Sequence, residues 1–275
     1  MHDRMEKQLT HMNAKQIILT ITTTAFVALT SRADSPGKIP NWGTDILHYF
    51  VQEKFTHNGV NSNASASVYL QFKEQGKAEH QKFDLVARKL ETNATYTLLA
   101  MEKGGTNYTE AMQFTTDASG TAKLKLKSQH TGNGNGDDKG NGHGQLPSAL
   151  DAVYEISSLA ISDVNTQMVM QADLTSPDRL QYLVKRKLVG DTAAALLQIK
   201  GTATKTQFRL TAVNLAPTNS YWLAINETIV QTNSTDSQGR LRINALATPV
   251  GSPMKIEKVQ LLDASTNVLL STELP

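Results

Sequence analysis

Residues 82–100 read KFDLVARKLETNATYTLLA and residues 207–225 read QFRLTAVNLAPTNSYWLAI, so the chain carries one stretch twice at an offset of 125 residues. In each copy Phe, Leu and Ala occupy alternate positions, a period of two that predicts a strand with one buried and one solvated face. A leucine, a polar turn and a tyrosine follow the strand in both copies. The copies share only apolar packing and turn chemistry, which decide the fold class and not the function.

The turn that follows this strand carries a family resemblance. A tyrosine stands six residues after a leucine in both copies, at Leu90 and Tyr96 and again at Leu215 and Tyr221. This spacing resembles the tyrosine corner of fibronectin type III and other immunoglobulin-like sandwiches, in which the phenol bonds back to the turn backbone. Several strand signals follow the corner here, so the resemblance implies the sandwich class and not the fibronectin strand order.

A later Thr-Asp-x-x-Gly turn, at 116–120 and 235–239, completes the repeated pattern. In such a turn the aspartate bonds its own backbone and the glycine takes a positive φ. The fuller pattern is similar to tandem repeats in uncharacterised secreted bacterial proteins, and this resemblance implies no activity.

Short alternating runs separated by Gly, Asn and Asp extend the strand pattern over most of the chain, at the spacing typical of a sandwich. We expect an all-β fold with two tandem antiparallel β-sandwich (Ig-like) modules after a cleaved signal peptide. The expected divisions are upstream residues and signal peptide at 1–33, an irregular lead-in at 34–64, module 1 at 65–176, a linker at 177–190 and module 2 at 191–275. Within the lead-in, the residues around Tyr49 fit either a short amphipathic helix or a first strand.

The N-terminal stretch has the features of a secretory leader. Lys15 precedes an apolar segment at 16–29, and Ser31 and Ala33 give a small-x-small cleavage site. The alternatives are a membrane anchor or a first buried strand, but the segment is shorter than the roughly 18–20 apolar residues that span a bilayer. The sequence therefore predicts a secreted or periplasmic protein with no membrane insertion after cleavage.

Charge and cysteine content limit the classes of partner. Loss of residues 1–33 would remove four of 27 basic and two of 25 acidic residues, so the mature chain would be neutral with histidine uncharged. A neutral chain lacks the overall charge typical of nucleic-acid or anionic-membrane binding, and we expect neither. The absence of cysteine excludes disulfides, thiolate metal sites and a lipid-modified cysteine.

A glycine-rich stretch at 128–150 in module 1 is the one segment of unusual composition. It fits a flexible surface loop, because many glycines raise the entropy lost on ordering while little apolar area offsets it. Alternatively it binds calcium, since Asn133, Asn135 and Asp137 at alternate positions resemble the start of an EF-hand loop and Asp138 is a further candidate ligand. However, Gly144 stands where the bidentate glutamate belongs. A transition-metal site at His130 and His143 is a third option.

Other candidate residues each have a structural explanation beside the functional one. Trp222 lies on the face opposite the core, so it lines either the interface with module 1 or a ligand surface shared with Tyr108. His48 and His57 form a weak metal pair, because no third residue nearby has ligand spacing. The basic residues at 185–187, and the alternating lysines at 123–127, fit either an acidic partner or solvated strand faces.

No catalytic constellation stands out, since the chain has neither a G-x-S-x-G elbow nor an H-E-x-x-H motif. We therefore expect a non-enzymatic, cofactor-free protein that serves as a structural, adhesive or assembly component of the bacterial envelope or extracellular space. Its partner would be a protein or an envelope component. The alternative is a carbohydrate- or calcium-binding accessory module.

Overall fold

The computed structural model describes residues 39–59, 63–128, 144–248 and 250–274. These residues form strands almost throughout, with three single-turn 3-10 helices, η1 (Ser148–Leu150), η2 (Val153–Glu155) and η3 (Pro253–Lys255). The predicted all-β class is therefore confirmed. The expected leader at 1–33 and the metal candidates Asn133, Asn135, Asp137 and Asp138 lie outside the described residues.

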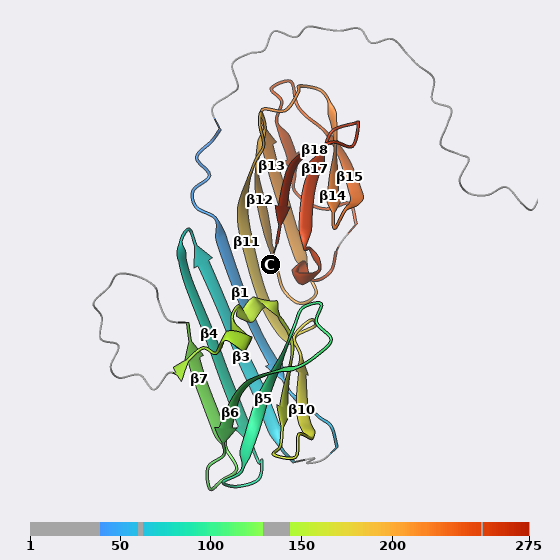
Figure 1. Cartoon of the computed structure of the whole chain (residues 1–275). Helices are drawn as coiled ribbons and strands as arrows, with labels where there is room; N and C mark the ends of the chain where they lie inside the picture. Colours follow the sequence, from blue (N-terminus) through green and yellow to red (C-terminus); the bar gives the residue numbers. More distant parts are fainter. Residues whose placement is uncertain (1–38, 60–62, 129–143, 249, 275) are drawn as a thin grey trace, which may run out of the picture. The chain divides into compact units, whose positions relative to one another are not determined.

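The strands form three sheets, whose elements Figure 1 labels. A nine-stranded sheet has the order β16 (Leu241–Ile243), β13 (Thr206–Val213), β12 (Ala194–Gly201), β11 (Arg179–Val189), β1 (Ile46–Lys54), β3 (Ser65–Gln75), β4 (Ala78–Arg88), β7 (Ala122–Lys127) and β8 (Gly144–Gln145). A five-stranded sheet has the order β2 (Thr56–His57), β10 (Met168–Asp173), β9 (Ile156–Ser162), β5 (Thr95–Glu102) and β6 (Thr109–Thr115). A four-stranded sheet has the order β15 (Thr228–Ser234), β14 (Ser220–Ile225), β17 (Lys258–Leu262) and β18 (Val268–Glu273).

The sequence repeat has a counterpart in the strand order. From its centre outward, one half of the large sheet has the order β1, β3, β4 and β7. The other half has the corresponding order β11, β12, β13 and β16. The order β10, β9, β5 and β6 is likewise matched by β18, β17, β14 and β15. All these pairings are antiparallel, and the buried side chains of the three sheets form one sandwich-like hydrophobic core.

Strands β1 and β11 pair with each other and join the two halves of the large sheet. Both carry Leu-x-Tyr-x-Val, at 47–51 and 180–184, and Tyr49 lies opposite Tyr182. Because the same motif pairs antiparallel with itself, a local two-fold relation centres on the two tyrosines, as in a symmetric dimer interface. Burial raises the pKa of both phenols.

This seam corrects two expectations about local structure. The lead-in, expected to be irregular apart from a first strand or a short helix around Tyr49, contains the nine-residue strand β1, and the segment expected to be a linker contains the eleven-residue strand β11. In each strand burial alternates from residue to residue, but the sequence of neither strand reveals its partner. Their pairing puts Leu47 beside Val184, both buried in the core, and makes the two segments central strands of the large sheet.

The two tyrosine corners have the same hydrogen-bonding pattern. The hydroxyl of Tyr96 accepts from the N–H of Glu91 at 3.1 Å, and that of Tyr221 accepts from the N–H of Ala216 at 2.9 Å. The Thr-Asp-x-x-Gly turn closes against each corner, because Leu215 N–H donates to the carbonyl of Gly239 at 3.1 Å and the first copy repeats this bond. Corner and turn therefore form one interlocked unit in each copy.

Candidate functional site

The nine-stranded sheet buries one face, and among the described residues most side chains of its other face are half-buried or exposed. Along β1, for example, Leu47, Tyr49 and Val51 are buried, while His48 and Phe50 point the opposite way. The pairing register carries this alternation from strand to strand. We call the side opposite the core the outer face.

Basic side chains dominate the outer face. From β1, β3, β4 and β7 they are Lys54, Lys73, Lys82, Arg88, Lys123, Lys125 and Lys127. From β11, β12, β13 and β16 they are Arg179, Lys185, Lys187, Lys200, Arg209 and Arg242. Within the strands that the structure describes, the acidic residue among these outward positions is Asp84. Thirteen cations against one carboxylate give the face a strong positive potential.

The single carboxylate on the outer face is already paired. Asp84 Oδ2 lies 2.6 Å from Lys82 Nζ, and the same ammonium lies 4.9 Å from the centre of the Tyr69 ring. Phe50 meets Tyr69 edge to face, with ring centroids 4.8 Å apart. A half-buried aromatic pair thus lies within the basic surface and supports the lysine stem and head group.

Amide side chains lie between the cations. Across the strands, Gln198 lies opposite Lys185 on one side and Arg209 on the other. In the neighbouring row Lys200 pairs with Gln207 and with Leu183, which lies opposite His48 across the seam. The outer face therefore offers charged donors together with neutral groups that both donate and accept.

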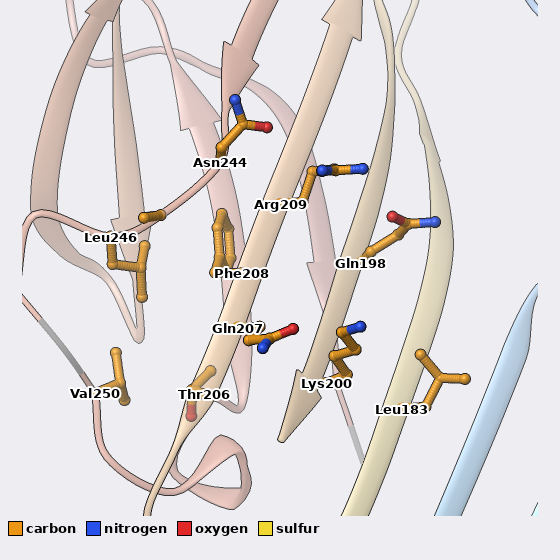
Figure 2. Close-up of a pocket in the computed structure, with 11 residues that line it drawn as sticks. Leu183, Gln198, Lys200, Thr206, Gln207, Phe208, Arg209, Asn244, Leu246 and Val250 are labelled. Atoms are coloured by element: carbon orange, nitrogen blue, oxygen red, sulfur yellow. The ribbon is translucent and has the colours of Figure 1, made fainter. Parts of the chain in front are cut away.

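Two hollows run along this surface and share Leu183, Lys200 and Gln207. The first has a volume of about 540 Å³, and Gln198, Arg209 and Asn244 also line it. Figure 2 shows Gln207 and Arg209 on one strand beside Gln198 and Lys200 on the next. The second hollow, of about 760 Å³, continues over β1 and β3 along His48, Phe50, Tyr69, Gln71 and Lys73. Together they form a groove that crosses the seam, which we call the seam groove.

The predicted ligand residues lie elsewhere. Trp222 is half-buried in the four-stranded sheet, on β14, and Tyr108 precedes β6 and exchanges a 2.6 Å hydrogen bond with Ser158. The two belong to different small sheets, and neither lines the seam groove. Of the sequence-derived candidates that the structure describes, Trp222 and Tyr108 therefore do not come together in one site.

The turn aspartates use their carboxylates within their own turns. The carboxylate of Asp117 accepts from Ser119 Oγ and from the N–H groups of Ser119 and Thr121, and these bonds lower its pKa. Asp236 accepts from the N–H groups of Arg240 and Gln238, which likewise lower its pKa. Over the described residues, no cluster of three or more potential metal ligands occurs. His48 lies on the outer face of β1, apart from His57 on β2.

The sequence contained a signal for the outer face that charge totals obscured. Lysines occupy alternate positions in 123–127, and each of the other seven strands carries one to three outward cations. When each strand is taken alone, these residues predict only a solvated face. Arg186, in the middle of the basic run, turns to the opposite side and binds Glu74 through two hydrogen bonds of 2.8 and 3.2 Å. Only the sheet order shows that the remaining cations belong to one surface.

Comparison with protein-family models, with curated proteins and with solved structures found no match. Among the residues that the structure describes, no helix is long and apolar enough to cross a membrane.

Proposed function

We propose that the chain is an exported, non-catalytic protein built from two Ig-like sandwich repeats, and that it attaches to an acidic partner through the outer face of its nine-stranded sheet. The observation that carries the proposal is the distribution of charge. Thirteen basic residues and one acidic residue share this face in a chain whose mature net charge would be zero. Such segregation has an electrostatic cost from mutual repulsion, which an acidic partner would relieve.

The expectation of no nucleic-acid or anionic-membrane binding came from the net charge alone. A net charge of zero describes the whole molecule and not each of its faces. It therefore does not exclude binding of nucleic acid or an anionic membrane to one basic face. An envelope or matrix role remains the preferred setting, because the leader-like sequence at 1–33 favours export. Polyanions are the partners that suit a large, flat basic surface.

The test is co-sedimentation of the protein with the envelope fraction of its source organism at low and high salt. We expect saturable pelleting at low ionic strength that is lost as salt screens the charges. Pelleting that resists salt would contradict attachment by the outer face. Repeating the measurement with a calcium chelator at constant ionic strength tests the calcium-binding alternative. If that alternative holds, pelleting disappears when calcium is removed.

A further inference from the structure

We propose that the seam groove binds a linear acidic polysaccharide, one that carries carboxylate or sulfate groups, laid across the β1–β11 seam. This inference rests on the proposed function, because it names the acidic partner of the same face. The groove gathers Lys200, Arg209 and Lys73 along a path that runs from β13 through β12, β11 and β1 to β3.

The spacing of the cations suits a sugar polymer. Neighbouring strands lie about 4.8 Å apart, so Lys200 on β12 and Lys73 on β3, which stand three strands apart in one cross-strand row, are separated by roughly 14 Å. A linear chain that carries acidic groups along its length can contact both cations while its intervening sugars lie over β11 and β1. Between two anions such a chain presents hydroxyl groups, which both donate to and accept from an amide such as that of Gln198.

The aromatic side chains of the groove argue against nucleic acid. Single-stranded nucleic acids bind by stacking bases on exposed aromatic faces. Here Phe50 and Tyr69 are half-buried and packed edge to face, and the ammonium of Lys82 lies over the Tyr69 ring. The edge contact and the ammonium both reduce the ring face that is open to a stacked base.

The apolar content of the face argues against a lipid surface. Proteins that lie in a membrane interface bury a continuous apolar face among the head groups. Of the large hydrophobic side chains that are exposed in the described residues, Val189 is the one on the outer face. Without an apolar face to insert, the protein would be held on a bilayer by charge alone. The amide side chains and the groove would then have no role in binding.

The test measures binding of the full chain to immobilised polygalacturonate and heparin, as carboxylated and sulfated probes, with dextran as the neutral control. Single-stranded DNA, duplex DNA and vesicles containing phosphatidylglycerol are the competing polyanions. We expect tighter binding to at least one acidic polysaccharide than to DNA or vesicles at equal salt, and none to dextran. The variant Lys73→Gln/Lys200→Gln/Arg209→Gln should weaken that binding about tenfold or more, since each exposed contact contributes modestly.

A matched variant, Lys103→Gln/Lys255→Gln/Lys258→Gln, removes three cations away from the outer face and should bind as the unaltered chain does. If no polyanion binds, the proposed function and this inference both fail. If DNA or vesicles bind best, the proposed function stands and the polysaccharide assignment is overturned. If the groove variant and the matched variant bind equally, the seam groove is not the site. Circular dichroism of each variant establishes that lost binding is not lost folding.

Discussion

Gly239 offers the sharpest test of the interlocked corner and turn. Its φ is +69°, and a Cβ at this position would lie 2.1 Å from the carbonyl oxygen of Leu215, a backbone atom that cannot rotate away. Gly239→Ala therefore combines a left-handed backbone, which costs a non-glycine residue about 1–2 kcal/mol, with a clash that forces the turn open. Opening the turn removes the bonds from Leu215 N–H to Gly239 O and from Gly239 N–H to Asp236 O, each 3.1 Å.

The expected loss follows from these terms. Two backbone hydrogen bonds contribute about 1 kcal/mol each, so Gly239→Ala should lower the free energy of unfolding by about 3–4 kcal/mol. For a chain of this size the melting temperature should fall by roughly 10 °C. Urea unfolding followed by tryptophan fluorescence, together with thermal scans by circular dichroism, measures both quantities.

A second glycine separates the two causes. Gly104 has a φ of +73°, but a Cβ there would meet no atom within 4 Å. Gly104→Ala carries the conformational cost without the clash, and the smaller entropy of the unfolded chain offsets part of that cost. We expect it to lose about 1 kcal/mol. Equal losses at Gly104 and Gly239 would refute the account, whereas Gly120→Ala should reproduce the larger loss because its Cβ would lie 2.1 Å from the carbonyl oxygen of Leu90.

The other predictions concern the corner, the seam and the turn carboxylates. Tyr221→Phe removes the acceptor of the Ala216 N–H and should cost about 1 kcal/mol in urea unfolding. Arg186→Met breaks the bidentate contact with Glu74 and should cost about 1–2 kcal/mol, while Lys187→Met, an exposed neighbour, should change stability by less than about 0.5 kcal/mol. Because hydrogen bonds hold the pKa of Asp236 below its ordinary value, its carboxylate stabilises the fold above the unfolded-state pKa, and this contribution disappears as the pH falls through the folded-state pKa. Asp236→Asn should therefore be less stable than the unaltered chain at neutral pH and approach it in acid, as thermal scans over a pH series would show; a gap that stays constant across pH would contradict this origin.

The location of the charges changes what can be inferred from composition. A neutral chain argues against polyanion binding only if its charges are mixed over the surface. Here the strand pairing sorts them, because residues at alternate positions of eight strands point to one side. Acidic residues such as Glu53 and Glu74 stand in the same strands at the opposite parity. The outer face is thus basic because most basic residues of these strands occupy outward positions and most acidic residues inward ones. It does not need an excess of basic residues in the chain.

The sequence by itself determined the all-β class and the repeated unit, because these depend on local periodicity and turn chemistry. Three patterns depend on contacts between residues within about 35 positions of each other. They are the alternation around Phe83 and Phe208, the leucine-to-tyrosine spacing and the Thr-Asp-x-x-Gly turns. The hydrogen bonds of Tyr96 and Tyr221 to the turns join residues five apart. Information of this range is present in a single stretch of sequence.

Only the tertiary structure decided the seam and the candidate site. The pairing of Tyr49 with Tyr182 joins residues 133 positions apart, and Lys73 comes into the same groove as Lys200 and Arg209 through that pairing. An amphipathic strand specifies which of its faces is buried but not which strand lies beside it. The sorting of thirteen cations onto one face therefore depended on strand order, which no local pattern in the sequence encodes.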